Sequence, residues 1–182
     1  AVDPCEANNI FNMWVGWKYQ PRIGECKQYI YLMQHILCAG CEIEFDYLLK
    51  WTASTIQKPS EKLGISPAFI GAQGTGKGMF MSHLGALHGK HFKHIINEDQ
   101  IIGRFNLHLR DATLIFLDEA CVSSVRAADK IKGLITETSI MLEGKGLQCI
   151  EGRSYSNMCF AVSSVLAVIA ELGGSNTLPN VL

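Results

Sequence analysis

The sequence predicts an α/β fold in which helices cover both faces of a mostly parallel sheet. From Ser66 onward, short apolar runs that suit buried strands alternate with runs of helical periodicity, and this alternation is typical of βαβ units. Before that point the apolar residues recur at helical spacing, which predicts a small helical section ahead of the sheet.

We expect a helical lead-in over residues 1–62 and an α/β core over residues 63–182, truncated at its C-terminus. Apolar residues at helical spacing in 29–37 and 43–51 indicate two helices joined near Gly40. A polar turn that contains proline ends the lead-in.

The cysteine pair Cys38 and Cys41 invites a zinc interpretation. Cys26 and His35 would have to complete the four ligands, and no second close pair follows. A helix end with Gly40 as its cap explains the spacing better.

The core is predicted to alternate strands and helices, with one hairpin near its C-terminal end. Strands are expected at 67–70, 94–96, 112–117 and 158–162, helices at 78–87, 99–105 and 125–136, and a hairpin at 140–151.

Composition restricts the possible functions. The 182 residues are 48% hydrophobic and carry a formal net charge of -1, which excludes a protein that coats nucleic acid through bulk positive charge. The longest apolar run, 158–170, is shorter than the roughly 20 residues of a transmembrane helix, and the N-terminus has no signal-peptide features. We therefore expect a cytoplasmic protein without a membrane partner, and, because Ala1 is not Met, a piece of a longer chain.

The central motif is a glycine-rich loop between the first predicted strand and the next helix. It fits G-x-x-x-x-G-K, in which glycines bring backbone N–H groups close to phosphate oxygens and the lysine reaches the outer phosphates. The residues predicted to bind ATP are Gly71, Ala72, Gln73, Gly74, Thr75, Gly76, Lys77, Gly78 and Met79.

The motif departs from its usual form at Gly78, where Ser or Thr normally ligates Mg²⁺. Magnesium would then depend on a second motif, on phosphate oxygens and on water. That motif is Asp118-Glu119, which follows four apolar residues of a predicted buried strand. We expect Asp118 to hold Mg²⁺ and Glu119 to orient or deprotonate the attacking water. An acidic helix start is the plainer alternative.

Loop and acids together predict a P-loop NTPase, and the chain resembles superfamily III helicases of the kind found after primase or primase-polymerase domains in phages and plasmids. Four stretches carry the resemblance: 55–59, 71–78, 103–120, and 132–136 together with 143–146. The resemblance implies an AAA+-like three-layer fold, a hexameric ring, a primase domain in the parent chain and a location in bacterial or phage-infected cells.

In such helicases a hairpin after the acidic motif holds single-stranded DNA in the ring channel. Here that role would fall on Lys145, between Gly144 and Gly146, because flanking glycines allow close approach to a phosphate. Lys132 and Arg153 are weaker candidates. An ordinary solvated lysine remains an alternative for Lys145.

The resemblance also implies a polar sensor after the last strand, which would be Ser164, where the family usually has Asn. No Arg follows Arg153, although the family uses a later arginine that reaches a neighbour's nucleotide. The sequence therefore predicts an ATP-dependent DNA helicase module and leaves open a catalytically incomplete nucleotide-binding or assembly fragment. A small-molecule kinase is disfavoured, since lid arginines are missing.

Overall fold

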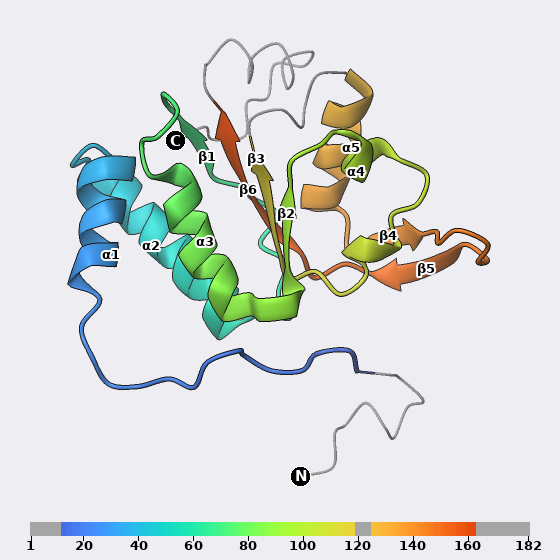
Figure 1. Cartoon of the computed structure of the whole chain (residues 1–182), viewed down its shortest axis with the longest axis horizontal. Coiled ribbons are helices and arrows are strands. Elements are labelled where there is room, and N and C mark those ends of the chain that lie inside the picture. The colour runs from blue at the N-terminus through green and yellow to red at the C-terminus, as the bar shows by residue number, and fades with distance from the viewer. Residues whose placement is uncertain (1–11, 119–124, 163–182) are drawn as a thin grey trace.

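A four-stranded parallel sheet forms the centre of the computed structural model, which describes residues 12–118 and 125–162. Helices lie on both sides of this sheet (Figure 1). The strands, in spatial order, are β1 (Ala68–Ile70), β6 (Asn157–Val162), β3 (Leu114–Asp118) and β2 (Phe92–Ile95). The prediction of a mixed α/β chain with a parallel sheet is confirmed.

Each face of the sheet has its own helices and its own core cluster. One face is covered by α1 (Lys27–Tyr31), the π-helix η2 (Leu32–Leu37), α2 (Glu42–Gln57) and α3 (Lys77–His88). The other face is covered by α4 (Asp99–Ile102), the 3-10 turn η4 (Leu107–Leu109) and α5 (Val125–Thr136). A second 3-10 turn, η3 (Gly89–His91), leads from α3 into β2.

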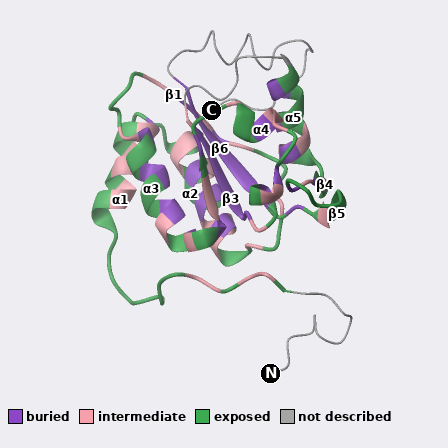
Figure 2. Cartoon of the chain, turned by 45° about the vertical axis from the view of Figure 1, so that its right-hand side comes forward, coloured by how far each residue is buried: buried purple, intermediate pink, exposed green. Residues whose placement is uncertain are grey.

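Strand β3 shows why the sequence forms this sheet. Leu114 and Phe116 pack into one cluster, whereas Ile115 and Leu117 pack into the other. Successive side chains of a strand point to opposite faces, so a continuous apolar run is what a strand buried on both faces requires. The purple strands at the centre of Figure 2 show this burial.

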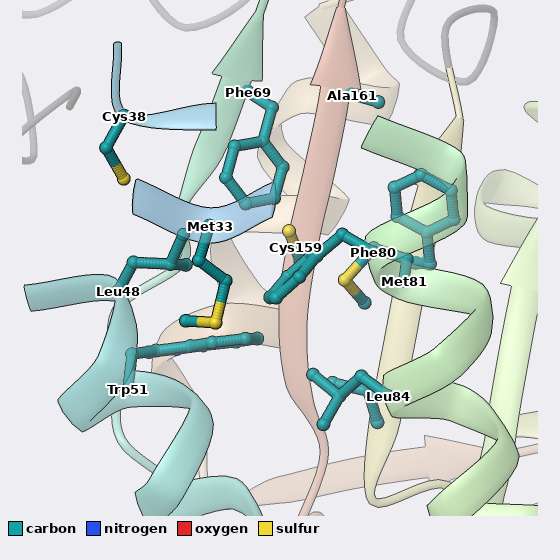
Figure 3. Packing of buried hydrophobic residues seen from close by; sticks show 12 residues of the cluster. Met33, Cys38, Leu48, Trp51, Phe69, Phe80, Met81, Leu84, Cys159 and Ala161 are labelled. Atoms are coloured by element: carbon teal, nitrogen blue, oxygen red, sulfur yellow. The ribbon is translucent and has the colours of Figure 1, made fainter. Parts of the chain in front are cut away.

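The predicted pair of N-terminal helices is confirmed, and it shares a core with the sheet. Met33 and Trp51 pack in one cluster with Phe80 of α3 and Cys159 of β6, as the side chains in Figure 3 show. The division of the chain at residue 62 stays a prediction.

Several element ends differ from the sequence prediction because tertiary contacts fix them. The helix α4 ends at Ile102, not at residue 105, because the chain turns at Gly103 and its next residues bond to the hairpin. Strand β2 begins two residues earlier than predicted, since Phe92 pairs with Leu114 of β3.

The predicted hairpin is present as a separate antiparallel sheet of β4 (Ser139–Leu142) and β5 (Ile150–Arg153). It lies beyond the end of α5 and away from the carboxyl ends of the parallel strands (Figure 1). None of the helices within residues 12–118 and 125–162 has the length and apolar character needed to cross a membrane.

We predict that His88 makes folding stability depend on pH. The side chain is fully buried, and its Nδ1 lies 2.8 Å from Thr113 Oγ1. Burial, with a smaller contribution from His91, lowers the pKa of His88 from 6.5 to about 4. Between these values the unfolded chain binds the proton and the folded chain does not, so stability falls as the pH drops.

For a shift of this size the free energy of unfolding should fall by about 2 kcal/mol between pH 7 and pH 5. Urea unfolding at both pH values measures it. A His88→Gln variant should lose most of this dependence, whereas His83→Gln, an exposed change on the same helix, should retain it. Equal pH dependence in all three proteins would contradict the prediction.

Candidate functional site

The glycine-rich loop leaves the sheet at the carboxyl end of β1 and enters α3 directly. The Gly71 N–H donates a 3.1 Å hydrogen bond to the carbonyl of Val162 at the end of β6, which fixes the start of the loop. Gly74 and Gly76 have φ of 83° and 93°, a left-handed conformation that side chains with a β-carbon rarely adopt. Gly76 then serves as the N-cap of α3.

The loop presents its backbone donors to the outside. Within the described part of the chain, the N–H groups of residues 74 and 76–79 donate to no backbone carbonyl. They surround the N-terminus of the twelve-residue helix α3, whose aligned peptide dipoles add partial positive charge there. Free N–H groups at a helix N-terminus form a favourable place for an anion such as phosphate.

Lys77 folds back onto this loop. Its side chain is buried, with the residue 7% exposed, and its ammonium group donates to the carbonyls of Gly71 and Ala72 at 2.5 and 2.9 Å. A third, longer contact of 3.4 Å reaches Thr75 Oγ1. The positive charge is therefore held by neutral oxygens, which an incoming anion can replace.

Asp118 lies at the same edge of the sheet as the loop. It is the last residue of β3, paired with Ala161 of β6, and with the loop it lines a cavity of about 510 Å³. The residues that line this cavity are Gln73, Gly74, Thr75, Gly76, Lys77, Gly78, Met79, Ile96 and Asp118. Two of the three predicted catalytic residues, Lys77 and Asp118, thus meet at one cavity.

Other predicted site residues are placed differently. Gly71 and Ala72 form the start of the loop and bond to Lys77, without lining the cavity. Glu119, predicted to act on water, and Ser164, the predicted sensor, lie outside the described residues. Val162 ends β6 two residues before Ser164, between β1 and β3.

His94 is a site residue that the sequence analysis missed. Its Nε2 lies 3.2 Å from Asp118 Oδ2, and its ring lies 5.1 Å from that of Phe116. The parallel register pairs His94 with Phe116, so period-two alternation places His94 and Asp118 on the same face. Pairing the two predicted strands in register was the signal that could have found it.

The donors at this edge suit a hard cation that keeps most of its water. Asp118 offers a carboxylate, and within the described ranges no three His, Cys, Asp or Glu side chains gather around one point. A β-carbon added at Gly78 would meet no atom within 4 Å. The sequence lacks the hydroxyl that the loop motif usually carries at this position, and the structure has room for one.

The predicted DNA-binding hairpin has a tight turn around Lys145. The Leu147 N–H donates to the carbonyl of Gly144, and Gly146 has φ of 74°. A β-carbon at Gly144 would lie 2.8 Å from Leu147 and 3.0 Å from Leu107. The positive φ of Gly146 favours glycine, whereas a side chain at Gly144 would only displace the ends of the Leu147 and Leu107 side chains. Lys145 between them is exposed.

The segment after α4 forms hydrogen bonds with the residues just before this turn. The Asn106 side chain donates to the carbonyl of Met141 at 2.7 Å and accepts from the Glu143 N–H at 2.9 Å. Arg104 Nε lies 2.6 Å from Glu143 Oε1, while the Arg104 side chain is 77% exposed. Arg104 thus forms an ion pair with Glu143, two residues before Lys145, a contact that the sequence analysis did not assign.

The two weaker DNA-binding candidates are not part of this turn. Arg153 pairs with Ser139 at the opposite end of the hairpin, and its guanidinium lies 5.4 Å from the Tyr155 ring centroid. Lys132 is an exposed residue of α5. The structure brings neither of them to the Lys145 turn.

Fold and site define a mixed α/β chain whose parallel sheet carries a glycine-rich loop and an acidic residue at one edge. The chain belongs to DUF5906, a family of unknown function whose model matches residues 69–172. It is similar to the DNA primase-polymerase of Nitratiruptor phage NrS-1, with 24% identity over 149 residues, or 76% of this chain and 20% of that protein. The chain thus spans about a fifth of the length of this relative.

The fold is similar to solved structures of the C-terminal region of NrS-1. One apo structure matches with a TM-score of 0.71 and 19% identity, over 82% of this chain and 36% of that chain. The A form matches with a TM-score of 0.69 and 22% identity, over 80% and 35%. At these identities the likeness shows that the fold is shared.

Proposed function

We propose that this chain is the ATP-hydrolysing motor module of a replication protein and that it moves along single-stranded DNA. One observation carries the proposal: Lys77 and Asp118 line one cavity. The loop of Lys77 follows β1 and Asp118 ends β3, and β6 lies between these two strands in the sheet. A P-loop NTPase of the superfamily III helicase type accounts for this arrangement. The similarity to a DNA primase-polymerase supports the replication setting.

The loop provides the contacts that a triphosphate needs. Backbone N–H groups between residues 74 and 79 bind phosphate oxygens, and Lys77 exchanges its carbonyl contacts for the outer phosphates. The cavity of about 510 Å³ lies within the roughly 300–1,000 Å³ of small-molecule sites. Met79 and Ile96, both exposed apolar residues at its rim, offer surface to the rest of the nucleotide.

The two acidic residues, Asp118 and Glu119, have different roles in hydrolysis. Asp118 holds the magnesium ion, which when bound neutralises charge on the phosphates. The hydrogen bond from His94 orients the Asp118 carboxylate. Glu119, the next residue, acts as general base toward water, and Ser164 follows β6 as the polar sensor.

The hairpin supplies the contact with DNA. Lys145 stands exposed between two glycines on a turn fixed by Asn106 and Glu143, so its ammonium can approach a backbone phosphate closely. Six copies in a ring give a positively charged track, although each chain has a net charge of -1. The upstream part of the parent chain carries a primase domain.

The direct test is ATP binding by Lys77→Ala. Losing two charge-assisted hydrogen bonds should cost about 2–4 kcal/mol, or roughly 30- to 1,000-fold in affinity. Titration of a fluorescent ATP analogue into the full chain measures it. Lys50→Ala, which removes an exposed lysine paired with Asp46 on α2, is the control and should bind like wild type.

ATP hydrolysis with and without single-stranded DNA then separates a motor from an incomplete relative. Turnover stimulated by DNA supports the motor, whereas tight binding without turnover supports a nucleotide-binding assembly module. If wild type and Lys77→Ala bind the analogue equally weakly, the loop is not a nucleotide site.

A second prediction concerns magnesium. Gly78→Ser restores the hydroxyl of the usual motif in a position with free space, so it should tighten ATP binding several-fold in the presence of Mg²⁺ and leave metal-free binding unchanged. Gly78→Ala is the matched control, since it adds the same β-carbon without the oxygen. Equal gains in both variants would show that helix stabilisation, not metal ligation, is responsible.

A third prediction concerns the hairpin. Lys145→Ala should weaken single-stranded DNA binding and reduce the slope of log affinity against log salt by about 0.7 for each lost phosphate contact, without changing ATP affinity. Fluorescence anisotropy with a labelled oligonucleotide at several salt concentrations measures both quantities. Lys132→Ala, an exposed change on α5, is the comparison, and an equal loss there would remove the special role of the hairpin tip.

A further inference from the structure

The N-terminal π-helix packs directly against the glycine-rich loop. A β-carbon added at Gly76 would lie 2.9 Å from Leu32 Cδ1 and 3.8 Å from Ile36 Cγ2. The Leu32 side chain therefore occupies the space beside Gly76 that a side chain there would need. This contact joins two segments more than forty residues apart in the sequence.

The backbone conformation of Gly76 sets the direction in which the loop enters α3. It has φ of 93°, caps α3 and immediately precedes Lys77. A rotation at Gly76 would redirect the first N–H groups of α3 and the base of the Lys77 side chain together. Whatever fixes Gly76 thus determines how well the anion-binding groups are organised before a ligand arrives.

The π-helix is held against α3 by a second set of contacts. Tyr29, one turn earlier, donates from its hydroxyl to the carbonyl of Phe80 at 3.2 Å, and the two rings stack at 5.3 Å. Phe80 belongs to the first turns of α3. The lead-in and the start of α3 therefore pack together, and the Leu32 side chain lies beside Gly76.

The backbone of this element is unusual. Residues 32–37 form a π-helix, and the Cys38 N–H donates to the carbonyl of Met33, five residues earlier. Ala39 then has φ of 47°, a costly conformation for a residue with a β-carbon. Wide turns of this kind occur mostly inside helices and frequently at functional sites. The π-helix of this chain begins at Leu32, the residue that lies beside Gly76.

We infer that Leu32 is a positioning residue for the glycine-rich loop. It holds Gly76 in its left-handed conformation and so keeps the loop N–H groups and Lys77 arranged for an anion. Ligand binding at the loop in turn stabilises the π-helix, because coupling between two sites is reciprocal. The inference rests on the proposed ATP site for its ligand, but its effect on the free loop does not require ATP.

The test compares Leu32→Ala with Leu37→Ala in the full chain. Both residues belong to the π-helix, are partly buried and pack against the same core cluster, but only Leu32 reaches Gly76. In the free protein, hydrogen exchange of the Phe80 amide, which donates to the Gly76 carbonyl, should accelerate several-fold in Leu32→Ala and stay at the wild-type rate in Leu37→Ala. Leu32→Met, which refills the space, should restore slow exchange.

Binding provides the second readout. Leu32→Ala should weaken binding of the fluorescent ATP analogue about tenfold relative to Leu37→Ala, and bound ATP should slow exchange at the Cys38 amide in wild type. If both alanine variants show the same exchange rate at the Phe80 amide and the same affinity, Leu32 has a packing role only and the inference fails. If wild type binds no ATP, the proposed function fails, and the free-protein exchange rates still decide the role of Leu32.

Discussion

The parallel alignment of the four central strands is the constraint on which the rest of the structure depends. All four carboxyl ends meet at one edge, and β6 stands between the strand that leads into the loop and the strand that ends in Asp118. Every residue of β6 is buried, so this strand has little freedom to shift. Its ladder to β1 and β3 therefore fixes the start of the loop and the acidic residue relative to each other before any ligand is present.

The connection between β3 and β6 separates the two proposed activities in space. A parallel partner for β3 requires the chain to return to the other edge of the sheet, and α5 makes that return. The hairpin follows α5 at the far end, and the chain then rises again through β6 (Figure 1). In chain order, α5 therefore lies between the strand that ends in Asp118 and the hairpin that carries Lys145.

Local sequence patterns predicted most helices and strands. Tertiary contacts determined the features that these patterns did not predict. The loop, the strand before it, the acidic strand and α5 were predictable, because apolar runs and glycine spacing act over a few residues. The His94 contact with Asp118 requires the strand register, which no short stretch encodes. The early end of α4 arises from Asn106 bonding to the hairpin 35 and 37 residues away. The π-helix had the periodicity of an ordinary helix and was predicted as one.

The packing of the lead-in also bears on what counts as the minimal site. The family model matches residues 69–172, yet the face of α3 that holds Phe80, Met81 and Leu84 is covered in part by Met33 and Trp51 of the lead-in. Without the lead-in this apolar face would meet water, and Gly76 would lose the Leu32 contact. The similarity to the phage primase-polymerase extends over 149 residues, more than the family match spans. In this chain, therefore, helical residues that precede the matched segment lie against the glycine-rich loop at Gly76.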